Sequence, residues 1–262
     1  MNRRYSILFA VVVLLLSTGP ALAQEVHKTY SVSIEALPAP VRISAPAVVE
    51  SFGFEVAEGF APGYIAGQVG WTAFSASLVE GHIDTANPAT GTQHLRIAND
   101  PAVGAGSNTG AFSPEVADAV VDASYVEVDV AISATGGADY DVVPQTPTQG
   151  LLTAQVKFYY LGDIQVLDDT GSGLAFIDTG TDWNVGPYTT LGIYVDPVAN
   201  TIDYYYGGSL IYTSVAGVFG GTIIEQVVLF SDNYHAGEVG DFDNLVIERG
   251  EVPVELVSFD VK

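Results

Sequence analysis

The sequence predicts an all-β fold, a two-sheet antiparallel β-sandwich of the jelly-roll type. About a dozen short stretches alternate apolar and polar residues, turn residues separate them, and almost no stretch has helical spacing. Strands of this kind bury one face and leave the other to solvent. In a curved sandwich, such a free face forms a groove in which a ligand could lie.

The clearest part of the pattern runs from residue 188 to residue 214, YTTLGIYVDPVANTIDYYYGGSLIYTS, and predicts three strands and two turns. Leucine, isoleucine and valine alternate with more polar residues in the first strand, and inward tyrosines continue the alternation in the second. Pro197 sets the backbone of the first turn, where Asn200 tolerates a left-handed conformation. Gly207 and Gly208 predict a tight hairpin turn before the third strand.

The other strands follow from the same alternation. The longest is expected at 151–161, and the segment 114–123 is the one stretch with helical spacing, where we expect a single turn. The remaining expected strands are 30–34, 94–97, 125–132, 164–167 paired with 174–177, 223–230 and 245–247.

The ends of the chain are expected to lie outside the sandwich. Arg3 and Arg4 precede an apolar run, and Ala21-Leu22-Ala23 offers a small-residue cleavage site. Residues 1–23 are therefore expected to be a signal peptide of a secreted protein that keeps no transmembrane anchor. The expected parts of the mature chain are an N-terminal strand and Pro-rich linker at 24–49, the sandwich at 50–250, and a C-terminal tail at 251–262.

Composition excludes several classes of function. The chain has 31 Asp and Glu against 8 Lys and Arg, a net charge of -23, which argues against nucleic acid as a partner. The acidity has two interpretations: solubility in a salty habitat, or calcium binding by carboxylates. Cysteine is absent, which excludes thiolate metal sites and thiol chemistry.

The order of strands and turns in 188–214 resembles the concanavalin A-like lectin and glucanase superfamily, including laminin-G-like domains of secreted bacterial proteins. Further phrases at 50–55, 67–71, 91–97 and 241–247 extend the resemblance over most of the mature chain. It implies a concanavalin A-like jelly roll and carries no catalytic signature of its own.

The C-terminal residues 252–259, VPVELVSF, carry a second resemblance. They are similar to the tract that often leads into the sorting domain of type IX secretion substrates in Bacteroidota, which implies the cell surface. The alternative is that this tract is a last strand of the sandwich.

Glu127 and Asp129 are the first residues to consider for catalysis. Laminarinase-type enzymes of the superfamily place a nucleophile, an assisting Asp and an acid on alternate residues of one strand. Glu127 and Asp129 match the first two positions, but Ala131 or Ile132 occupies the third. A retaining glycosidase needs two carboxyls about 5 Å apart, and the residue that would serve as the acid is missing here. We therefore expect no catalytic residues on this strand and interpret both carboxylates as groove-facing or solvent-facing polar residues.

Sugar binding would use aromatic rings beside planar polar groups, because a ring covers the apolar face of a pyranose. Alternation places Tyr194 and Tyr205 on the polar faces of their strands, so these rings are the best candidates, together with Trp183, Glu127 and Asp129. The alternative is that most of these aromatic residues belong to the core or to cross-strand pairs.

The calcium candidates lie near the end of the sandwich. Asp232 precedes a loop, and Asp241, Asp243 and Asn244 follow it, so these oxygens are predicted to hold a structural Ca²⁺. A separate pair is Asp178 with Asp182. All of these residue types also serve as ordinary turn residues.

These observations predict a secreted, non-catalytic, lectin-like module that binds a polysaccharide or surface glycan. The alternatives are a structural or adhesive cell-surface protein without specific sugar binding, and an enzyme that degrades polysaccharide. A third carboxylate that converges on Glu127 would favour the enzyme.

Overall fold

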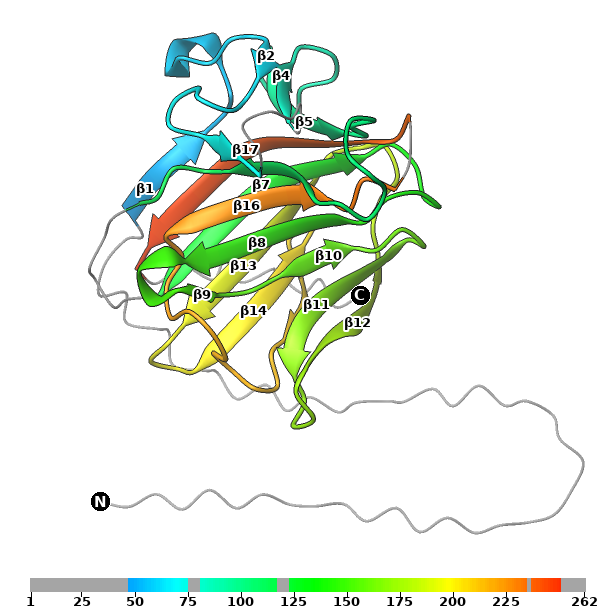
Figure 1. The fold of residues 1–262 in the computed structure, drawn as a ribbon. Helices are drawn as coiled ribbons and strands as arrows, with labels where there is room; N and C mark the ends of the chain where they lie inside the picture. The colour runs from blue at the N-terminus through cyan, green and yellow to red at the C-terminus, as the bar shows by residue number, and fades with distance from the viewer. Residues whose placement is uncertain (1–46, 75–80, 117–122, 235–236, 251–262) are drawn as a thin grey trace, which may run out of the picture. The chain divides into compact units, whose positions relative to one another are not determined.

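The computed structural model describes residues 47–74, 81–116, 123–234 and 237–250, which form two antiparallel β-sheets packed against each other (Figure 1). The predicted all-β sandwich is confirmed. In the described part of the chain, no helix has the length and apolar character needed to cross a membrane. The predictions for 1–46, for most of the helical turn at 114–123 and for the tail at 251–262 lie outside the described residues.

The first sheet has nine strands in the order β15-β14-β13-β7-β17-β5-β4-β2, and β1 also pairs with β17. All of its strand pairs are antiparallel, so both neighbours of β7 run opposite to it. Its strands are β1 Ala47–Phe52, β2 Gly63–Tyr64, β4 His82–Asp84, β5 His94–Ala98, β7 Ser124–Ile132, β13 Thr189–Asp196, β14 Thr201–Tyr206, β15 Ser209–Thr213 and β17 Val239–Arg249.

The second sheet has eight strands in the order β12-β11-β10-β8-β16-β6-β3, and β9 also pairs with β8. Its strands are β3 Thr72–Ala73, β6 Thr109–Phe112, β8 Tyr140–Thr146, β9 Leu151–Leu152, β10 Val156–Phe158, β11 Asp163–Asp169, β12 Leu174–Asp182 and β16 Gln226–Ser231. Two short 3-10 turns, η1 Val56–Glu58 and η2 Pro147–Gln149, complete the described elements.

The segment 188–214 folds as predicted, into β13, β14 and β15. Asp196 accepts the backbone amides of Val198 and Ala199, each at 2.8 Å, and so closes the first turn. Asn200 has a φ of 57°, in the left-handed region that asparagine tolerates. At the hairpin, Gly207 and Gly208 have φ values of 57° and 77°, which residues with a Cβ adopt only with strain.

The prediction of a longest strand at 151–161 is wrong. That segment holds two short strands, β9 and β10, and the longest strand is β17. The amides of Thr153 and Ala154 both donate to the carbonyl of Pro144, at 2.9 and 3.2 Å. Two successive amides on one acceptor interrupt the ladder with β8, so the segment pairs with β8 as two separate strands, β9 and β10.

The core lies between the sheets and determines which side chains face outward. In β7, Val126, Val128 and Val130 are buried, so the residues between them point away from the core. Trp71 packs edge-on against Phe52, with ring centroids 5.2 Å apart. Burial of each such side chain stabilises the fold by about 1.5–3 kcal/mol. A shift in the register of β7 by one residue would move its three valines to the outer face, and the loss of this burial disfavours the shift strongly.

Candidate functional site

The candidate site is the outer face of the nine-stranded sheet, where it crosses β14, β13, β7 and β17. Alternation in these strands turns polar and aromatic side chains away from the core. We call this set the outer tyrosine face, and its members are Tyr125, Glu127, Asp129, Tyr194, Tyr205 and Glu248.

Strand register arranges the outer tyrosine face in rows across the sheet. Gly192 pairs with Tyr205 on one side and with Glu127 on the other, which forms one row. In the next row, Tyr194 pairs with Tyr125, which in turn pairs with Glu248 of β17. Directly opposite residues lie about 5 Å apart, so Tyr125 and Glu248 are neighbours in the second row, whereas Tyr205 and Glu127 lie about 10 Å apart on either side of Gly192.

Tyr125 lies over Gly192. A Cβ on this glycine would lie 3.0 Å from Cζ and 3.1 Å from Cε2 of the Tyr125 ring. The Tyr125 hydroxyl donates a hydrogen bond of 2.9 Å to Oε2 of Glu127. Burial raises the pKa of Tyr125, and the charge of Glu127 raises it further, so the hydroxyl keeps its proton.

The carboxylates of this face differ in their surroundings. Glu127 is exposed. Burial raises the pKa of Glu248, and the charge of Glu127 adds to the effect. Asp129 is already engaged, because it accepts hydrogen bonds from the Thr190 hydroxyl at 2.5 Å and from the Asn244 amide at 2.9 Å.

Four of the predicted sugar-binding residues, Tyr194, Tyr205, Glu127 and Asp129, lie on this one face. The prediction that Trp183 joins them is wrong. Trp183 is 5% exposed and belongs to the core, where its indole nitrogen donates to the Tyr159 carbonyl at 3.1 Å. Its large apolar ring fills space between the sheets, where a sugar has no access.

The sequence did not single out Tyr125 and Glu248. Tyr125 could have been found, because it alternates with the buried valines of β7 just as Glu127 does. Glu248 could not, because its place depends on the register between β7 and β17, two segments far apart in the chain.

The four predicted calcium ligands do not form one group. Asp241, Asp243 and Asn244 lie on β17, whereas Asp232 follows β16 of the other sheet and accepts the amide of Asp139 at 3.0 Å. Among the described residues, no three His, Asp or Glu side chains have a metal-holding arrangement. The predicted set of four is therefore wrong as a set, and calcium binding itself stays a prediction.

Protein groups already occupy the oxygens of Asp241 and Asp243. Asp243 accepts the backbone amides of Ala89 and Thr90, at 2.9 and 3.1 Å. Asp241 binds Arg96, with an Nε to Oδ1 distance of 2.7 Å, and His94, with Nε2 3.1 Å from the same oxygen. Burial alone would raise the pKa of Asp241, but these two partners outweigh burial and lower it.

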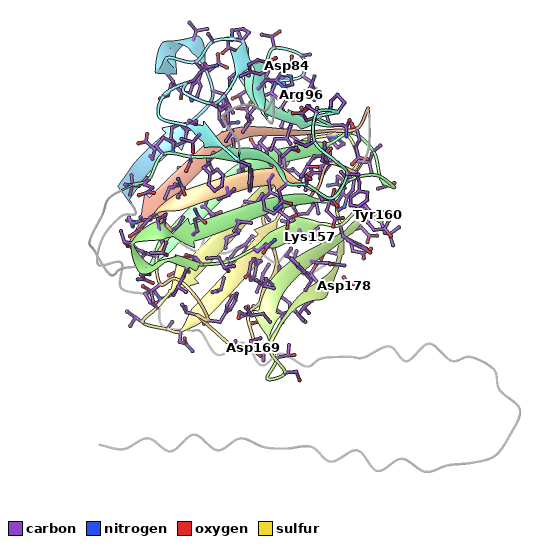
Figure 2. All side chains as sticks on the ribbon, in the orientation of Figure 1. Asp84, Arg96, Lys157, Tyr160, Asp169 and Asp178 are labelled. Atoms are coloured by element: carbon purple, nitrogen blue, oxygen red, sulfur yellow. The ribbon has the colours of Figure 1, made fainter. Side chains whose placement is uncertain are left out.

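Arg96 also binds Asp84 at 2.7 Å, and the two lie together beside β4 and β5 (Figure 2). Its guanidinium is thus shared between two carboxylates and links β5 to its two neighbours in the sheet, β4 and β17.

Solved structures share the fold at low sequence identity. A sialidase aligns with a TM-score of 0.52 and 13% identity, over 80% of this chain and 19% of the sialidase chain. The binding domain of botulinum neurotoxin serotype D aligns at 0.49 and 12% identity, over 79% of this chain and 49% of that one. The Bacillus licheniformis β-glucanase aligns with a TM-score of 0.47 and 12% identity, over 80% of this chain and 100% of the glucanase chain.

No protein-family model and no curated protein matches the sequence. The likeness to the sialidase shows a shared fold, and this fold is the two-sheet antiparallel sandwich that the sequence predicts.

Proposed function

We propose that the protein binds carbohydrate through the outer tyrosine face and does not alter its ligand. The observation that carries this proposal is the pair of rows that brings Tyr205, Tyr194 and Tyr125 onto one face together with Glu127 and Glu248. Tyrosine rings cover the apolar face of a pyranose, while carboxylates accept hydrogen bonds from its hydroxyls. The shared fold with a sialidase is consistent with a glycan ligand, although fold alone does not imply function.

A glycan-array screen of the chain from Gln24 to Lys262, in calcium and again in chelator, tests the proposal. Binding should weaken about fivefold in Tyr205→Ala, because one stacked ring contributes about 1 kcal/mol. The matched control is Tyr234→Ala, which removes a 62% exposed tyrosine after β16 and should bind like the wild type.

The results for the two variants and the two calcium conditions distinguish the candidate functions. Equal loss of binding in both variants would remove the outer tyrosine face as the site. No binding in any condition would favour the structural or adhesive role at the cell surface. Binding that chelator abolishes would support the calcium prediction, and unchanged binding would count against it.

One observation favours an enzyme as the second candidate. Glu248 is the third carboxylate near Glu127, and its position is diagonal to Glu127 across β17 and β7. Diagonal neighbours lie about 7–8 Å apart at the backbone, and carboxyl groups at a similar separation, about 6.5–9.5 Å, are typical of inverting glycosidases. Release of reducing sugar from a bound polysaccharide, lost in both Glu127→Gln and Glu248→Gln, would establish hydrolysis and overturn the non-catalytic proposal.

The secreted location is part of the same proposal and rests on the signal peptide expected at 1–23. Fractionation of the producing cells tests it. Protein found only inside the cell, with residues 1–23 still attached, would contradict both the location and the glycan partner.

A further inference from the structure

A lysine and two aspartates lie together on the eight-stranded sheet, away from the outer tyrosine face. Lys157 is on β10, where Figure 2 labels it. Its Nζ lies 2.9 Å from Oδ2 of Asp139 and 3.6 Å from Oδ2 of Asp141. The side chains of Lys157, Asp139 and Asp141 are 16%, 11% and 1% exposed, so little water reaches the group.

Neighbouring groups hold the three side chains in place. Asp139 accepts the amide of Tyr160 on its other oxygen, Oδ1, at 2.9 Å. Lys157 and Asp141 are directly paired across β10 and β8. The ring of Phe176 covers the amine, with its centroid 4.7 Å from Nζ.

Asp141 is the unusual member of the group. Its Oδ1 accepts the Gln155 amide at 2.7 Å, but its Oδ2, which faces Nζ, has no hydrogen-bond partner among the described residues. An ordinary buried ion pair would satisfy both oxygens, because an unpaired buried oxygen destabilises the fold. A buried acid oxygen 3.6 Å from an amine is instead suited to carry a proton.

The shifts in the pKa values of Asp141 and Lys157 are consistent with Asp141 as a proton carrier. Burial raises the pKa of Asp141 to about 7, against a smaller opposing effect of Lys157. Burial lowers the pKa of Lys157, but Asp141 and Asp139 outweigh it and raise that pKa. Asp141 therefore exchanges a proton near neutral pH, whereas Lys157 stays an ammonium, so its attack on a neighbour requires transfer of a proton from Nζ to an acceptor such as Asp141.

We propose that Lys157 and Asp139 form an intramolecular isopeptide bond, and that Asp141 transfers the protons. The amine of Lys157 attacks Cγ of Asp139, a C–N bond forms, and one Cγ–O bond breaks. Of the three protons on the lysine ammonium, one stays on the amide and two leave with the oxygen as water. Asp141 carries these two protons one after the other from the nitrogen to the leaving oxygen and ends in its starting state.

The fold supplies the driving force for this condensation. In water an amide of this kind hydrolyses, but groups fixed in contact have effective molarities of about 10⁵–10⁸ M. The bond would join β10 to the start of β8 and close a covalent loop, as a disulfide does. The chain has no cysteine for that purpose.

Mass spectrometry of the intact purified protein tests the proposal. The wild type should weigh one water molecule less than its sequence, and fragmentation should give a branched peptide that joins residues 139 and 157. Lys157→Arg and Asp141→Asn should each restore the full mass. Asp139→Asn should still crosslink, with loss of ammonia in place of water.

The matched control is Asp178→Asn, on the edge strand β12 (Figure 2), which should keep the crosslink. A wild-type mass equal to that of the sequence would overturn the proposal, whether or not the variants fold. A loss of water that persists in Lys157→Arg would also overturn it, because that loss would come from another residue.

Discussion

The outer faces of the two sheets follow the same alternation but differ in burial. On the nine-stranded sheet, Glu127 is exposed, and the tyrosines around it are half-buried. On the eight-stranded sheet, the outward residues Val228 and Asp141 are only 4% and 0% exposed, because neighbouring side chains cover them. A side chain that points outward is therefore not always exposed, so the first face suits a ligand and the second suits bonds within the protein.

Because the two faces differ in burial, we expect substitutions of polar groups on them to affect different properties. Polar groups on the outer tyrosine face should matter for binding and little for stability. The same kinds of group around Lys157 should matter for stability, because their partners are buried.

The largest effect is expected for Lys157→Met. It leaves Asp141 buried without its positive partner, and removal of one partner from a buried pair destabilises a protein by about 3–5 kcal/mol. Loss of the proposed crosslink acts in the same direction. Urea unfolding at pH 7 measures the change. The control on the exposed face, Glu127→Gln, should shift the free energy of unfolding by less than about 0.5 kcal/mol. Equal shifts in the two variants would contradict the comparison.

The next largest effect is expected for Gly192→Val. Its side chain would occupy the space of the Tyr125 ring and separate that hydroxyl from Glu127. Overpacking of this kind destabilises by about 1–3 kcal/mol, and glycan binding should be lost with the tyrosine rows. Thermal unfolding and the glycan array measure the two effects. A variant that folds and binds like the wild type would show that Tyr125 has no part in the site.

Local alternation was sufficient to predict much of this arrangement. It separated Tyr205 from the buried Tyr204, and it placed Tyr194 and Glu127 on the polar faces of their own strands before any strand pairing was known. The turn at Asn200 and the hairpin at Gly207 followed from residue chemistry alone.

The remaining features depend on contacts between distant segments. The carbonyl of Pro144 divides the expected strand at 151–161, and no local pattern shows which carbonyl will meet those amides. Trp183 has no clear alternation around it, so its burial could not be read from its neighbours. The meeting of Lys157 with Asp139 depends on the register of β10 against β8, which the packing of the sheets sets.

The smallest expected effect is a change in the pKa of Glu248. Glu127→Gln removes a nearby negative charge, so the pKa of Glu248 should fall toward its ordinary value. A raised pKa means that the folded state prefers the protonated acid. The contribution of Glu248 to stability is therefore present below its unfolded pKa and is lost as the pH rises through its folded pKa. Carboxyl NMR titration measures the shift.

The matched control for this titration is Asp203→Asn, a carboxylate of the same row, separated from Glu248 by Tyr194 and Tyr125. Three strand spacings separate β14 from β17, so the charge of Asp203 lies about 14 Å from Glu248. At this distance physiological salt largely screens the charge, so the pKa of Glu248 should stay unchanged. A fall in the control as large as that in Glu127→Gln would mean that the whole acidic surface raises the pKa. The pairing of Glu127 with Glu248, on which the hydrolase candidate depends, would then lose its support.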